Sequence, residues 1–136
     1  MQALTPYVCF NGNCREAMNF YKEVFEGKLE LMTWADGPHK DVSTGDPNKI
    51  MHGMLTNGSF NLMASDNPEG KAKFGDNVQL TINCESVPHI EKLFKALGTG
   101  GKTVMPLDNT FWGARFGMLT DKFGIYWMLN CPLEKK

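Results

Sequence analysis

The chain has 136 residues, with 14 Lys or Arg and 15 Asp or Glu, and its formal net charge is -1. This length suits one domain or two small halves that share a core, and the balanced charges lack the Lys/Arg clustering that nucleic acid requires. No stretch has the pattern of a secretory leader or the length of a membrane span. We therefore expect a compact cytoplasmic protein with no nucleic-acid partner and no membrane partner.

The first half predicts one helix among four strands. Strands are expected at 4–10, 28–35, 49–56 and 59–65, where apolar and β-branched residues cluster and Asn57-Gly58 supplies a hairpin turn. Asn13 and Glu16 form a capping signal, and apolar residues spaced by three and four predict a helix that ends at Gly27. The Gly- and Pro-rich segment 36–48 is expected to be a long loop.

The second half predicts the same order of elements after a Gly- and Pro-containing linker at 67–75. A helix opens at Ser86 and stops at Gly98, and strands are expected at 77–84, 102–107, 111–120 and 125–130. The segment from Asp121 to Gly124 has the residues of a tight turn between the last two strands.

The two halves repeat each other in residue type. A shift of 73 positions places Phe20 on Leu93 and Tyr21 on Phe94. We therefore predict an α+β fold made of two tandem βαβββ modules, 1–66 and 76–136, joined by the linker 67–75 within one domain of residues 1–136.

The four cysteines and nine methionines are expected to be mostly core residues. The cysteines form no Cys-x-x-Cys pair, so we expect buried free thiols that pack as small hydrophobes. Methionine fills irregular core space, although a pocket lined by it would tolerate varied ligands. The cysteines are Cys9, Cys14, Cys84 and Cys131.

The repeat resembles the vicinal oxygen chelate superfamily, which includes glyoxalase I, bleomycin-resistance proteins and extradiol dioxygenases. The resemblance covers nearly the whole chain and is carried by Pro6-Tyr7, Phe20-Tyr21, Met51-His52-Gly53 and the segment 112–130, which are similar to its PhnB-like branch. It implies two curved sheets around a cavity (the glyoxalase/bleomycin resistance/dioxygenase fold) and a homodimer. PhnB-like relatives are sometimes described as similar to a demethylubiquinone methyltransferase, a label disfavoured here because no Gly-rich strand-to-helix turn is present.

The resemblance also implies where a metal would bind. Enzymes of the superfamily hold a divalent ion through His, Gln or Glu on strands one, four, five and eight. These positions fall on Pro6, on Leu62 or Met63, on Gln79 and on Met128, of which only Gln79 has a donor side chain suited to the ion. Since a catalytic metal needs about three protein ligands, we expect no metal site and no cofactor.

The predicted cavity mixes polar and apolar side chains. Alternation along 77–84 places Gln79, Thr81 and Asn83 on one face, and the repeat would set Pro6, Val8 and Phe10 opposite them. Such a lining suits a small organic ligand, unless the amides simply bond to each other and fill the space. The candidate ligand-binding residues are His52, Gln79, Thr81, Trp112, Arg115, Tyr126 and Met128.

Three of these candidates have two possible roles. Arg115 shares a face with Tyr126 and can hold a carboxylate or phosphonate if Thr120 pairs with Ile125, whereas a shift of one residue turns it outward. Trp112 either stacks on a ligand or packs in a core or interface. His52 is either a hydrogen-bonded structural residue or a base.

Three functions remain open from the sequence. The first is a PhnB-like, dimeric protein that binds a small organic molecule in a metal-free cavity. The second is an enzyme of the glyoxalase/dioxygenase type with a noncanonical metal or a metal-free acid/base site, using His52, Gln79, Arg115 and Tyr126. The third is a structural or interaction protein whose cavities are filled. The missing ligand set favours the first.

Overall fold

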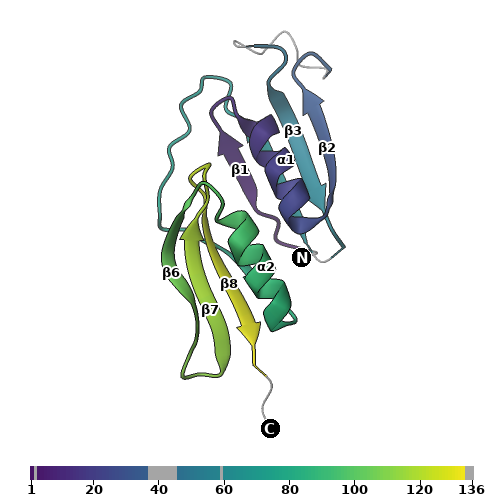
Figure 1. Ribbon diagram of the computed structural model, residues 1–136. Helices are drawn as coiled ribbons and strands as arrows, with labels where there is room; N and C mark the ends of the chain where they lie inside the picture. The colour runs from purple at the N-terminus through teal and green to yellow at the C-terminus, as the bar shows by residue number, and fades with distance from the viewer. Residues whose placement is uncertain (2, 37–45, 59, 134–136) are drawn as a thin grey trace. The chain divides into compact units, whose positions relative to one another are not determined.

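The computed structural model describes residues 1, 3–36, 46–58 and 60–133, and its contacts divide it into two units, Met1–Lys73 and Phe74–Lys136. The first unit contains β1 (Tyr7–Phe10), α1 (Cys14–Phe25), β2 (Lys28–Thr33), β3 (Ile50–Thr56) and β4 (Asn61–Asp66) (Figure 1). The second contains β5 (Leu80–Asn83), α2 (Val87–Leu97), β6 (Lys102–Asn109), β7 (Ala114–Thr120) and β8 (Tyr126–Pro132). The predicted α+β fold of two βαβββ modules is confirmed.

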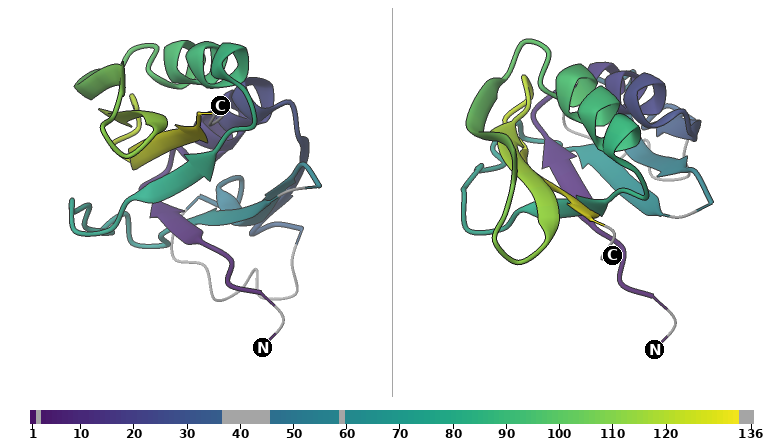
Figure 2. Two further views of the ribbon diagram at one scale, coloured as in Figure 1. Left: turned by 90° about the horizontal axis from the view of Figure 1, so that it is seen from below. Right: turned by 60° about the horizontal axis from the view of Figure 1, so that its bottom comes forward.

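Each unit is one four-stranded mixed sheet with one helix. The strand order is β1-β4-β3-β2 in the first and β5-β8-β7-β6 in the second, with the first-named pair parallel in each case. Both views of Figure 2 show each helix on a single face of its own sheet. No helix in the described ranges is long and apolar enough to cross a membrane.

The helix-covered face of the first sheet is the core of that unit. Strand alternation places Phe10, Leu55, Leu62 and Ala64 on this face, and all four are buried. Beneath α1 they meet its own apolar stripe, which includes the buried Tyr21. The hydrophobic spacing in the sequence therefore identified the packed face of α1.

The start of α1 differs from the prediction. Asn13 precedes the helix but its side chain makes no capping hydrogen bond. Asp66, at the end of β4, supplies the acceptor instead: its Oδ1 accepts from the backbone N–H groups of Gly12 (2.8 Å) and Cys14 (2.9 Å), and its Oδ2 accepts from that of Ile50 (2.9 Å). Capping by a residue 52 positions away along the chain leaves no local sequence signal.

The second unit uses the cap that the sequence predicts. The Oγ of Ser86 accepts a hydrogen bond from the backbone N–H of His89, and Pro88 occupies the first turn of α2. The apolar side of α2 covers β7 and β8, with Leu93 and Leu97 buried against that face. Trp127 and Leu129 of β8 are buried with them.

Asp121 sets the register of β7 and β8. Its Oδ1 accepts from the backbone N–H groups of Phe123 (2.8 Å) and Ile125 (3.1 Å), and its Oδ2 accepts from Trp127 Nε1 (2.8 Å). Because Ile125 is held within the turn, Thr120 pairs with Tyr126 and not with Ile125. The register is therefore the one that turns Arg115 away from Tyr126.

We predict that Asp121→Ala lowers the free energy of unfolding by about 2–4 kcal/mol, because it leaves three N–H donors in and beside the core without this acceptor. Urea denaturation followed by circular dichroism measures the loss, and the Trp127 indole N–H resonance should shift in the same variant.

The matched control is Asp76→Ala, at an exposed position outside the strands. If both variants unfold at the same urea concentration, Asp121 does not hold the turn.

Candidate functional site

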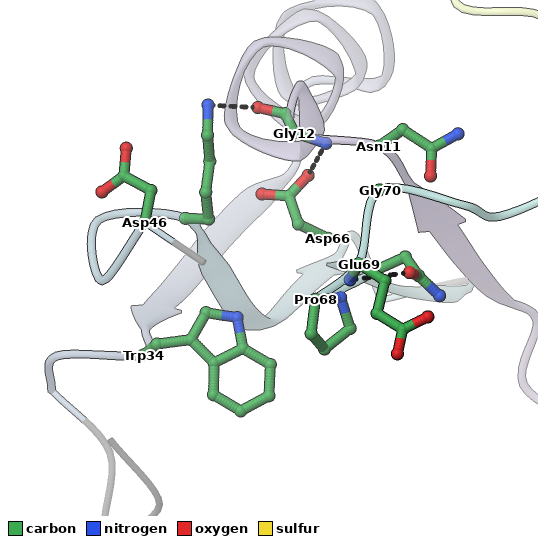
Figure 3. Close-up of a pocket in the computed structure, with 10 residues that line it drawn as sticks. Asn11, Gly12, Trp34, Asp46, Asp66, Pro68, Glu69 and Gly70 are labelled. Carbon is green, nitrogen blue, oxygen red and sulfur yellow. Dashed lines mark hydrogen bonds between the residues drawn. The ribbon is translucent and has the colours of Figure 1, made fainter. Parts of the chain in front are cut away.

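One surface pocket of about 240 Å³ lies in the first unit (Figure 3). It is bordered by the loop before α1, by Trp34 after β2, and by the turn that follows β4. The residues that line it are Asn11, Gly12, Trp34, Asp46, Lys49, Asp66, Asn67, Pro68, Glu69 and Gly70. None of the residues predicted from the sequence to bind a ligand belongs to this pocket.

Most polar groups in the pocket wall already bond to one another. Lys49 Nζ donates a hydrogen bond to the carbonyl oxygen of Gly12 at 2.8 Å, and the Asp66 carboxylate accepts hydrogen bonds from three backbone N–H groups. Asn67 Oδ1 accepts from the N–H groups of Glu69 (3.0 Å) and Lys71 (3.2 Å). These hydrogen bonds join the loop before α1, the start of β3 and the turn after β4. The polar groups of the pocket wall therefore stabilise the first unit.

Of the predicted site residues, Thr81, Tyr126 and Met128 lie instead on the face of the second sheet that α2 does not cover. We call this surface the open face. Its members, from β5, β7 and β8, are Thr81, Asn83, Phe116, Met118, Thr120, Tyr126, Met128 and Asn130. None of them carries a charge, and only Lys102 and Asp108 of the edge strand β6 border them with charges.

The open face is built in rows across the strands. Met105, Met118 and Met128 stand beside one another in β6, β7 and β8, and Thr81 of β5 continues the row. Two register shifts in the β6 pairing, on either side of Met105, are irregularities of the kind that bend a strand. The middle of the face is therefore a stripe of thioethers.

Polar and aromatic rows flank the methionine stripe. On one side Phe116, Asn130 and Asn83 are aligned, and Asn130 Nδ2 donates to Asn83 Oδ1 at 3.3 Å. On the other side Thr120 pairs with Tyr126. The sequence had indicated Thr81, Asn83, Tyr126, Met128 and Asn130, but it missed Phe116 and Met118, whose place on this face follows only from the β7–β8 register.

Trp112 forms an aromatic edge beside the open face. It lies between β6 and β7, is 57% exposed, and its ring centroid is 6.2 Å from that of Phe116 and 5.0 Å from that of Phe111. Phe111 is 97% exposed. Neither aromatic is a core residue, so the prediction that Trp112 packs in a core is wrong, while stacking on a ligand and packing in an interface stay predictions.

Arg115 lies on the other face of the sheet, with α2. It pairs with Cys131, which is buried, and its guanidinium holds Glu91 of α2 through Nε and Nη2, each 2.8 Å from Oε1. Its Nη1 also donates to Asn109 Oδ1 at 3.1 Å. Arg115 therefore braces the helix against the sheet and is not placed to hold a carboxylate with Tyr126.

His52 belongs to the corresponding face of the first sheet. It pairs with Met32, and its ring lies 6.0 Å from that of Tyr7. The expectation that Val8 and Phe10 line this face is wrong by one residue, because Val8 pairs with the buried Ala64 and Phe10 is fully buried under α1. Tyr7 and Cys9 take the positions that were assigned to Val8 and Phe10.

The sulfur-containing residues also differ from the prediction. Of the nine methionines only Met18 belongs to the buried core, and those on the uncovered faces include Met54 and Met63 of the first unit as well as the stripe of the second. Among the cysteines the expected free, buried thiols are confirmed except at Cys9, which is exposed. Burial raises the pKa of Cys14 to about 12 and that of Cys84 to about 11, so these thiols are protonated and poor nucleophiles.

The side chains do not fit a superfamily metal centre. In the described part of the chain no three His, Cys, Asp or Glu residues lie close enough together to hold an ion. The uncovered positions of β4 and β8 include Met63 and Met128, whose thioethers are poor ligands for a hard divalent ion. These positions therefore do not offer the ligands that a hard divalent ion needs.

Comparison with known proteins identifies close relatives. A family model described as 3-demethylubiquinone-9 3-methyltransferase matches residues 2–130. Protein YjdN of Escherichia coli K12 is 30% identical, with 93% of each chain covered. Among solved structures, protein PA1353 from Pseudomonas aeruginosa is 43% identical with a TM-score of 0.88, covering 98% of this chain and all of that one.

Two further solved structures are similar to this chain in fold. A PhnB protein from Bacillus cereus, which carries the same methyltransferase description, is 28% identical with a TM-score of 0.79 and covers 96% of this chain and 99% of its own. A glyoxalase/bleomycin resistance protein/dioxygenase family enzyme from Burkholderia phytofirmans is 15% identical with a TM-score of 0.66 over 93% of this chain and 97% of that one. The second likeness shows a shared fold alone.

We predict that Arg115→Met lowers the free energy of unfolding by about 0.5–1 kcal/mol, the usual worth of a partly exposed ion pair. Glu91→Gln should lower the free energy of unfolding by a similar amount, and the double variant should lower it by less than the sum of the two single losses. A thermal or urea unfolding cycle over the four proteins measures this coupling. Strictly additive losses would show that the pair does not brace α2.

Proposed function

Because the chain belongs to the PhnB-like family of the glyoxalase/bleomycin resistance/dioxygenase superfamily, we propose that it binds a small organic molecule on the open face of its second unit, without a metal ion. The observation that carries this proposal is the methionine stripe of Met105, Met118 and Met128, set between rows of hydrogen-bonding side chains. Thioethers adapt to the shape of an apolar ligand, while a few polar groups fix its orientation.

Catalysis by a metal-free acid/base site is less well supported. The sequence offers His52, Gln79, Arg115 and Tyr126 for such a site, but Arg115 and Tyr126 lie on opposite faces of the same sheet. Arg115 is also occupied by Glu91. Gln79 and Tyr126 therefore lack Arg115 as a charged partner for acid/base chemistry.

The methyltransferase description of the family supports no methyl transfer here. A nucleotide-like methyl donor is commonly held at a helix N-terminus after a Gly-rich turn. In this chain Asp66 accepts from the N–H groups of Gly12 and Cys14 at the start of α1, and Ser86 caps α2. Both helix starts are thus used by the protein itself.

We predict that Met128→Lys abolishes ligand binding or weakens it at least about tenfold, because an ammonium in the middle of the thioether stripe must be desolvated by an apolar ligand. A screen of small aromatic molecules by thermal shift, followed by isothermal titration of the hits, measures the effect.

The matched control is Met32→Lys, the same change at an exposed position on the uncovered face of the first sheet. If Met32→Lys removes binding and Met128→Lys does not, the ligand site lies on the first unit and the proposal is wrong.

We also propose that the chain forms a homodimer through the hairpin between β6 and β7. Support comes from four exposed apolar residues along it, Val104, Met105, Phe111 and Trp112. Aromatic residues exposed together are typical of protein interfaces. Contact centred on Phe111, which is 97% exposed, would leave the open face and the ring of Trp112 accessible to a ligand.

We predict that Phe111→Ser lowers the dimer fraction at micromolar concentration by about tenfold, since it removes a large apolar contact. Light scattering after size exclusion gives the mass of each species. Val78→Ser, at a residue that is 70% exposed outside the hairpin, is the control. A dimer that survives the Phe111 change but not the Val78 change would place the interface elsewhere.

A further inference from the structure

Gln79 holds an acceptor that has no donor. Its Oε1 is buried and makes no hydrogen bond. Gln79 directly precedes β5, in which Thr81 lies on the open face, so alternation places Gln79 on that face as well. Leu80 pairs with Trp127, which sets Gln79 beside Tyr126 at the end of the open face.

A buried acceptor without a donor costs the folded chain the free energy of a lost hydrogen bond. The glutamine side chain can recover it by turning its amide toward the open face, where a bound molecule supplies an N–H or O–H group. A ligand that does so gains affinity over an otherwise identical ligand that cannot donate. Gln79 thus favours one functional group on the ligand.

The rest of the open face limits the charge and shape of the ligand. The strands β5, β7 and β8 contribute amides, hydroxyls, thioethers and aromatic rings to it but no charged side chain, and Arg115 is turned to the opposite face. The charges that border the face, Lys102 and Asp108, lie on β6, at the opposite edge of the sheet from β5. An anion or a cation beside Gln79 would therefore lose its hydration without gaining a countercharge next to it. Phe116 and Trp112 offer ring edges and faces to a flat molecule at one end.

We propose that the ligand of the open face is an uncharged aromatic molecule whose hydroxyl or N–H group donates a hydrogen bond to Oε1 of Gln79. This inference rests on the proposed function, because it names the chemical class that the same face would bind.

Three matched probes test the inference on the full chain. 2-Naphthol is neutral and donates, 2-methoxynaphthalene has the same rings but no donor, and 2-naphthoate carries a negative charge at neutral pH. Isothermal titration gives the affinities, and backbone amide shifts show where each probe binds. We expect 2-naphthol to bind about tenfold more tightly than the ether, the worth of one good hydrogen bond, and naphthoate to bind most weakly.

Two variants isolate the glutamine. Gln79→Met keeps the length of the side chain but removes the acceptor, so naphthol and the ether should then bind equally. Gln79→Glu keeps an acceptor and should retain the preference for naphthol while weakening naphthoate further. The wild-type comparison stands by itself if Gln79→Met fails to fold.

The possible failures are distinct. Equal wild-type affinities for naphthol and the ether, or tightest binding of naphthoate, overturn the inference while leaving ligand binding on the open face intact. A naphthol preference that survives in Gln79→Met assigns the donor contact to another residue and also overturns it. Amide shifts that avoid β5, β7 and β8, or no binding by any probe, overturn the proposed function together with the inference.

Discussion

The carboxylate of Asp121 determines which face of the second sheet each residue of β7 and β8 occupies. It holds the amides of Phe123 and Ile125 inside the turn, so that pairing resumes at Tyr126. A slip of one residue would exchange the two faces, and Met128 would point beneath α2. The hydrogen bond from the indole N–H of Trp127 also fixes this register, because Trp127 reaches Asp121 only from the core side of the strand. The open face and its methionine stripe depend on this one turn.

The first unit uses a carboxylate for a similar purpose. Asp66 and Asp121 are the buried charged residues of the described chain, and each accepts several hydrogen bonds. Asp66 accepts from backbone N–H groups far away along the chain, whereas Asp121 accepts from groups within the next six residues. A buried charge is tolerated only when such partners surround it. Both carboxylates are thus committed to holding the backbone. Neutral amides, hydroxyls and thioethers are left on the open face, and these groups suit the binding that we propose better than acid/base chemistry.

The order of helices and strands could be predicted from the sequence, but the face of the sheet on which each residue lies could not. Apolar spacing and turn residues identified both helices and every strand, since these signals are local. The β7–β8 register depends on which amides Asp121 captures, and Ile125, expected in the strand, belongs to the turn. The repeat shift of 73 positions, which aligns the two helices, also gave the wrong facing for β1. It equates Val8 with Thr81, whereas in the structure Tyr7 takes the place that Thr81 has in β5. The strands β1 and β5 are therefore related by a shift that is one residue longer. Residue type along the repeat does not distinguish the two shifts.

The uncovered faces of the two units place methionine at matching points, Met54 beside Met63 in one and Met118 beside Met128 in the other. The rows differ at their ends. In the first unit Tyr7 and Glu30 border the pair, whereas in the second Thr81 and Met105 do. A flexible thioether centre tolerates many apolar shapes, so it gives little discrimination by itself. Selectivity must therefore come from the flanking groups, and in the second unit these are neutral hydrogen-bonding side chains together with the aromatic edge of Trp112 and Phe116.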